Sequence, residues 1–143
     1  MFVETRDESR RFFFHVWQKM SEKRQLEPLE TLVAQVIKEH AEYHAILSVP
    51  DQALDRDYTP EEGGTNPFLH MGLHVALQEQ LQSDRPLGII ELYHRLRSSL
   101  CDDVHRTEHM IMECLAEALW QAGRSGAVSN ERDYLDCVRE HIA

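Results

Sequence analysis

Apolar side chains recur three and four positions apart along most of the chain, and they do not alternate with polar side chains over the length of a strand. This spacing is typical of helices that bury one face. The pattern therefore predicts an all-α fold, a bundle of about six helices with a four-helix-type core. The predicted helices are residues 4–22, residues 28–47, residues 67–82, a segment from Pro86 to Leu100, a segment that is capped by Asp102 or Asp103 and ends before Gly126, and a short segment capped by Ser129.

Local signals mark two of these helix starts and one long loop. Pro28 and Pro67 suit a first helical turn, because the amide at that position needs no intrahelical partner. Asn66 precedes Pro67 as a cap. Residues 48–65 contain two prolines and a Gly-Gly pair, which predicts a loop. Because loops of this length often form crossovers, lids or binding segments, it is a candidate cover for a site.

Composition narrows the class of protein. The 143 residues are 42% hydrophobic with a net charge of −10, and we interpret residues 1–143 as a single helical domain. The acidic balance argues against a nucleic-acid partner. No apolar run approaches the roughly 20 residues of a membrane span, and the start lacks the pattern of a secretory signal. Three cysteines without CxxC spacing indicate reduced thiols and a cytoplasmic protein.

Histidine is the unusual residue in this chain, because three segments repeat the spacing His-x-x-x-His. Residues four apart share one face of a helix, so each pair could hold one metal ion or serve two adjacent ions. Random placement of nine histidines in 143 positions would give about 0.5 such pairs. The three pairs are His40 with His44, His70 with His74, and His105 with His109.

The helical faces predict where these pairs point. At 100° per residue, all six rings fall on or beside the apolar stripe of their helix, so we expect them to point inward. Buried ring nitrogens need partners, since each unpaired one costs about 1–3 kcal/mol. The order of the helices brings the three pairs to one level of the bundle. Pairs on facing helices at one level are typical of a metal centre in a helical bundle.

Carboxylates complete the predicted ligand set. Glu108 lies inside the apolar arc between His105 and His109, and Glu113 lies one turn further on. We expect one of them to bind metal, bridge two ions or orient a ligand histidine. Imidazole with carboxylate suits iron, zinc, copper or nickel. Since these groups are too many for one tetrahedral ion, a dinuclear iron centre is predicted.

Open positions on such a centre would bind a small molecule of the dioxygen type: dioxygen itself, peroxide, nitric oxide or a redox substrate. The ligand chemistry and bundle architecture resemble those of haemerythrin-like di-iron proteins. Oxidase-like enzyme, sensor and metal carrier all stay open at this point, as does self-association into a homo-oligomer.

Two alternative functions follow from the same residues. The sequence HRTEH, His105 to His109, fits the inverted zinc-peptidase pattern H-x-x-E-H, with zinc as the metal and Glu108 as the catalytic base. In that hydrolase His70 or His74 would supply a third ligand. The other alternative is a non-catalytic interaction module, whose histidines are structural and bonded to carbonyl and carboxylate groups.

Three stretches of the chain resemble a bacterial family, the domain of unknown function 1841 family: EPLETLVAQVIKEHAEYH, NPFLHMGLHVALQEQLQSDRPLGI and HRTEHMIMECLAEALWQAGRSG. NPFLHMGLH is the most specific block, and the likeness covers nearly the whole chain. In that family a proline often follows the histidine at the position of His40, where this sequence has Ala41. A helix break there would separate His40 from His44. The resemblance implies no established activity.

Overall fold

The structure is a computed structural model, and it describes residues 6–50, 66–125 and 131–142. All regular elements in these ranges are helices, which confirms the predicted all-α class. The chain divides into two compact units, Met1–Val75 and Ala76–Ala143, and the boundary falls inside helix α5 (Pro67–Ser83). The assignment of residues 1–143 to one domain stays a prediction. Of the predicted loop at residues 48–65, residues 51–65 lie outside the described residues, as does the predicted cap Ser129.

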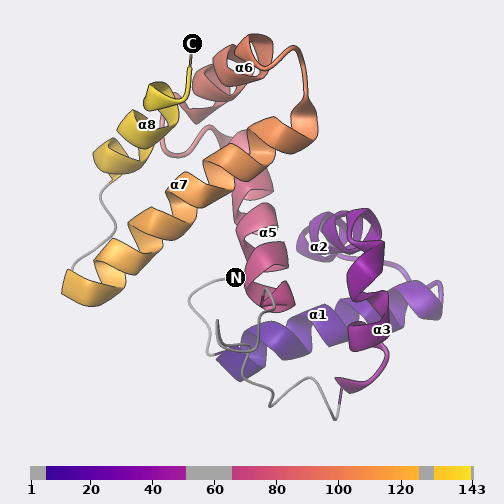
Figure 1. Ribbon diagram of the computed structural model, residues 1–143. Coiled ribbons are helices and arrows are strands. Elements are labelled where there is room, and N and C mark those ends of the chain that lie inside the picture. Colours follow the sequence, from indigo (N-terminus) through magenta and orange to yellow (C-terminus); the bar gives the residue numbers. More distant parts are fainter. Residues whose placement is uncertain (1–5, 51–65, 126–130, 143) are drawn as a thin grey trace. The chain divides into compact units, whose positions relative to one another are not determined.

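The first unit packs α1 (Arg6–Ser21), α2 (Pro28–Glu39), a 3-10 turn (Ala41–Tyr43), the short α3 (His44–Leu47) and the beginning of α5 (Figure 1). Helices α2 and α5 begin at the predicted residues, Pro28 and Pro67. Its core draws on each of these helices, because their apolar stripes face one another. The buried residues of this core are Phe13, Val16, Val33, Ala34, Val36, Ile37, Leu47, Phe68, Met71 and Val75.

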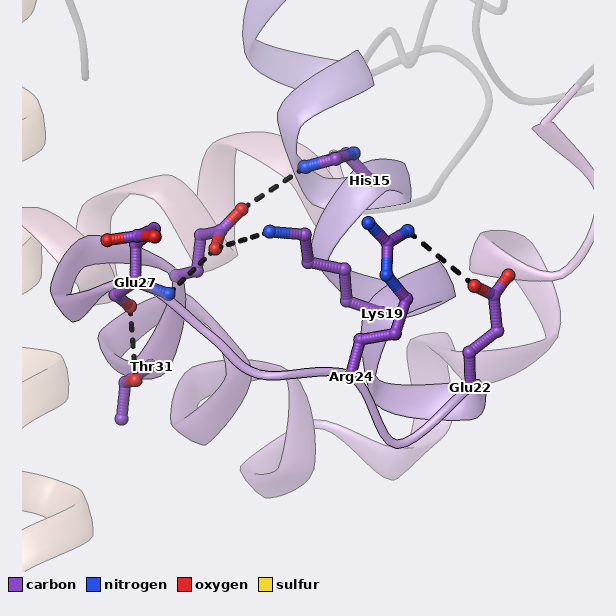
Figure 2. Close-up of polar contacts among 7 residues, drawn as sticks. His15, Lys19, Glu22, Arg24, Glu27 and Thr31 are labelled. Atoms are coloured by element: carbon purple, nitrogen blue, oxygen red, sulfur yellow. Dashed lines mark hydrogen bonds and ion pairs between the residues drawn. The ribbon is translucent and has the colours of Figure 1, made fainter.

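A buried carboxylate ties α1 to the start of α2. Glu30 Oε1 accepts hydrogen bonds from Lys19 Nζ and from the backbone N–H of Glu27, both at 2.8 Å (Figure 2). His15 Nε2 lies 3.2 Å from the other carboxylate oxygen. The hydrogen bond from Lys19, and next the one from Glu27, hold the pKa of Glu30 below its usual value. The charged carboxylate therefore supports the packing of these two helices.

Replacing Glu30 by Gln is expected to lower the thermal unfolding midpoint at pH 7 in the presence of a chelator. A carboxylate with a lowered folded-state pKa stabilises the fold above its unfolded value of about 4.3 and loses that effect as pH falls through the folded value. The deficit of Glu30→Gln should therefore shrink below about pH 4. Glu22→Gln is the control, because Glu22 is exposed and its contacts, with Gln18 Nε2 at 3.1 Å and with Arg24 at 3.6 Å, lie on the surface. A deficit that is constant with pH would contradict this account.

The second predicted helix is wrong in its C-terminal part. The apolar pattern predicts one helix over residues 28–47, but α2 ends at Glu39 and the backbone of His40 leaves the helical region, with φ −121° and ψ 61°. The N–H of His40 bonds to the Ile37 carbonyl, and ring Nδ1 of His40 lies 2.7 Å from the Val36 oxygen. The side chain thus takes the carbonyl that the N–H would use in a continued helix.

The second unit contains the end of α5 with α6 (Ile89–Ser99), α7 (Val104–Ser125) and α8 (Glu131–Glu140). Helices α6, α7 and α8 pack on one another, and α8 lies along α7 (Figure 1). Buried Tyr134 of α8 donates a hydrogen bond of 2.6 Å to Gln80 Oε1 of α5. Burial raises the pKa of Tyr134, which keeps its hydroxyl a donor.

Two helix starts in this unit are set by aspartates. The fourth helix begins at Ile89 and not at Pro86, because Gly88 adopts φ 99° and the Asp84 side chain accepts the N–H groups of Gly88 and Ile90. Only glycine adopts such a φ without strain. Asp103 caps α7 by accepting the N–H of Arg106 at 3.0 Å, which decides between the two predicted caps.

The expectation of reduced thiols is wrong for two of the three cysteines. Cys114 of α7 and Cys137 of α8 form a disulfide with their Cα atoms 5.8 Å apart, and Cys101 is a free, exposed thiol. The two partners are 23 residues apart in sequence, so only the packing of α8 on α7 brings them together. Among the described helices, none has both the length and the apolar character that crossing a bilayer requires.

Candidate metal centre

Three of the predicted ligand histidines come together in the first unit. One ring nitrogen from each of His40, His70 and His74 lies within 4.8 Å of the others. Three points so spaced lie within about 2.8 Å of a common centre, against the roughly 2.0–2.1 Å of a zinc–imidazole bond. His40 and His74 are buried and His70 is half-buried. A shift of less than about 1 Å per ring would allow all three to bind one ion.

The start of α5 places two of the three rings. Asn66 Oδ1 accepts the N–H groups of Phe68 and Leu69 at 3.0 and 3.1 Å, so the helix begins as the Asn-Pro pair predicts. The ring of Phe68 packs against those of Phe13 and Phe14, at 6.2 and 5.6 Å between centroids. Phe68, Met71 and Val75 are all buried in this core, so their packing sets which face of α5 is turned inward. His70 and His74, one turn apart, consequently lie on the same face of α5.

His40 supplies the third ring from the end of α2. Its ring centroid is 5.0 Å from that of His70 and 5.1 Å from that of His74. A carbonyl oxygen can only accept, so the Val36 contact puts the proton of the neutral ring on Nδ1 and leaves the lone pair on Nε2. An imidazole that donates through one nitrogen to a backbone carbonyl and binds metal through the other is the usual arrangement in metal sites.

Two further side chains border the cluster and were not predicted as ligands. Glu39 Oε2 lies 3.8 Å from His74 Nε2, and the Glu39 side chain is half exposed. The ring of Tyr43 stacks on that of His40 with an interplanar angle of 4°. Burial, and next the charge of Glu42, raise the pKa of Tyr43, so it remains a neutral phenol. The 3-10 turn that follows His40 brings Tyr43 to this place, and helical periodicity does not signal that turn.

His44 lies outside this group of three. Its Nε2 is 2.8 Å from the Ile37 carbonyl oxygen, and its ring packs against Trp17 with 4.7 Å between centroids. The predicted pairing of His40 with His44 on one helical face does not form, because the helix breaks between them. His44 instead satisfies a second carbonyl at the end of α2.

The third pair, His105 and His109, lies at the start of α7 in the second unit, with ring centroids 4.0 Å apart. His109 Nδ1 is 2.7 Å from the His105 carbonyl oxygen. His105 is exposed, against the expectation that all six histidine rings face inward, and Glu113 is exposed as well. Glu108 is buried and accepts a hydrogen bond of 2.8 Å from Gln78. A ligand or catalytic role for these four residues stays a prediction.

The fold and the cluster define the class: an all-α protein whose first unit carries three convergent, largely buried histidines. The model of one family, described as a domain of unknown function (DUF1841), matches residues 5–140. The chain belongs to this family, which confirms the resemblance seen in the sequence. No curated protein and no solved structure matches the chain. The likeness to haemerythrin-like proteins stays a prediction.

Proposed function

We propose that the protein is a metalloprotein whose first unit binds a transition-metal ion through His40, His70 and His74. The convergence of three imidazoles from two helices carries this proposal. The position of the His40 proton supports it, because the Val36 carbonyl holds that proton on Nδ1. A metal ion suits three imidazoles in a mostly buried site better than a water molecule does. With water in that place, the ring nitrogens would compete for few hydrogen-bond partners.

Iron is the proposed metal, and zinc is the alternative. The carboxylate of Glu39 lies next to His74, so the site can offer both nitrogen and oxygen ligands. Histidine with one carboxylate and open positions is typical of non-haem iron. Bound iron would supply a redox-active centre for dioxygen, peroxide, nitric oxide or a redox substrate. Within the chain, His40 and His74 would anchor the ion, and Tyr43 would shield the ring of His40 from water.

Elemental analysis of the full-length protein tests the proposal. The protein should be purified without a histidine tag, from cells supplied with iron, zinc, copper and nickel. We expect about one ion per chain from the three-histidine site alone, and about two if His105 and His109 hold a separate second ion. His74→Ala should remove the metal of the first unit, whereas His94→Ala should not, because His94 is exposed on α6.

The same samples separate the alternative functions. Zinc that is lost with His109→Ala but kept with His74→Ala would support the hydrolase based on HRTEH. Absence of metal, with a melting temperature that a chelator leaves unchanged, would support an interaction module with structural histidines. Full metal content in His74→Ala would overturn the proposed site.

A further inference from the structure

We propose a second metal site in the second unit, formed by Cys114, Cys137 and His141 and available only when the disulfide is reduced. The two sulfurs and one ring nitrogen of His141 lie within 4.8 Å of one another. Cys137 lies in the last turn of α8 and His141 directly follows that helix, and Cys114 faces them from α7. The site is independent of the three-histidine cluster, since every member lies in the second unit.

The ligand set identifies the ion. Two thiolates with one imidazole suit Zn²⁺, which binds sulfur at about 2.3 Å and nitrogen at about 2.0–2.1 Å. A tetrahedral ion holds its two thiolate sulfurs roughly 3.8 Å apart, which is farther than the two sulfurs of a disulfide. Side chains on Cα atoms 5.8 Å apart can reach this sulfur–sulfur distance. Water would take the fourth position. The disulfide and the zinc site therefore exclude each other, because both use the same two sulfurs.

The burial of the two cysteines determines which sulfur of the disulfide a reductant attacks first. Cys114 is buried, Cys137 is half-buried and His141 is exposed. A dithiol reductant can reach Cys137 first, so its thiolate attacks the sulfur of Cys137 and Cys114 leaves as a thiolate. The second thiol of the reductant then displaces Cys137 and closes the reductant's own disulfide. Two electrons and two protons pass to the protein, and binding of Zn²⁺ then releases the protons of both thiols.

The experiment uses the full chain with Cys101→Ser, which removes the exposed free thiol from the measurements. The oxidised protein should show no reactive thiol, and after treatment with a dithiol it should show two. Circular dichroism of the reduced protein should retain its helical signal. Co²⁺ serves as the probe, because thiolate ligands give a charge-transfer absorption that histidine ligands do not. We expect this band in the reduced protein and not in the oxidised protein.

Variants and competition decide the outcome. Cys137→Ser should abolish the cobalt band, and His141→Ala should weaken binding of Co²⁺ to the reduced protein, followed through that band, at least tenfold, whereas His94→Ala should leave it unchanged. Bound Zn²⁺ should also slow re-formation of the disulfide by oxidised glutathione. The proposal is overturned if the reduced, folded protein lacks the band, or if the band shows that His141→Ala binds Co²⁺ as tightly as His94→Ala. Loss of the helical signal on reduction alone would also overturn it, since the disulfide would then be a structural crosslink.

Discussion

Replacing His40 by alanine is expected to abolish metal binding by the first unit and to destabilise that unit even without metal. The first effect follows because His40 is the only ring of the cluster that does not come from α5. The second follows because ring Nδ1 satisfies the Val36 carbonyl at the end of α2. Loss of a buried hydrogen-bond partner costs about 1–3 kcal/mol. Metal content and urea unfolding in the presence of a chelator measure the two effects separately.

His40→Asn is the matched control for the two roles of this side chain. The amide of asparagine can donate a hydrogen bond from a position close to that of Nδ1, but it has no group in the position of Nε2. We therefore expect His40→Asn to recover most of the stability lost in His40→Ala and none of the metal binding. If His40→Asn binds metal like the unchanged protein, the cluster is not a metal centre.

Replacing Phe68 by alanine is expected to cause a large loss of stability in the first unit, about 3–5 kcal/mol. Phe68 is 6% exposed, and its ring packs against Phe13 and Phe14 with the Arg10 guanidinium 4.9 Å from its centroid. Such a loss is a large share of the roughly 5–15 kcal/mol that stabilises most domains. Because Phe68 helps to hold the first turns of α5 against the core, its loss should also weaken metal binding by His70 and His74.

Tryptophan fluorescence can report on the first unit alone. The chain has two tryptophans, and in a Trp120→Phe background only Trp17 of α1 remains. Urea unfolding followed through Trp17 should show the loss for Phe68→Ala, and a smaller loss for Phe68→Leu, which keeps most of the apolar volume. Leu69→Ala is the control, because Leu69 is next to Phe68 in the sequence but is 56% exposed. A loss below about 1 kcal/mol for Phe68→Ala would contradict the anchoring role.

The local chemistry of α5 made part of the candidate site predictable. Asn66 and Pro67 mark the first turn of α5, and the spacing of His70 and His74 then places both rings on one face. Both inferences depend on residues within about two turns of helix, where backbone geometry alone decides the neighbours. The same reasoning identified Asp103 as one of two candidate caps of α7.

The pairing of His40 with His44 shows where this reasoning fails. Apolar residues continue at helical spacing from Leu32 to Leu47, so the pattern predicts an unbroken helix. In the structure the imidazoles of His40 and His44 satisfy the carbonyls of Val36 and Ile37, and the backbone turns away. A histidine can cap a helix end or continue the helix, and the choice depends on the residues that pack against its side chain in the folded protein.

By itself, the sequence determined the all-α class, most of the helix boundaries and the histidine pair on α5, because these depend on periodicity and on caps a few residues long. Only the tertiary structure decided that His40 joins that pair, that His44 packs on Trp17, and that Cys114 bonds to Cys137. Each of these contacts joins residues on different helices or beyond a helix break. Their proximity is set by how apolar faces pack in space, and spacing along a single helix does not contain that information.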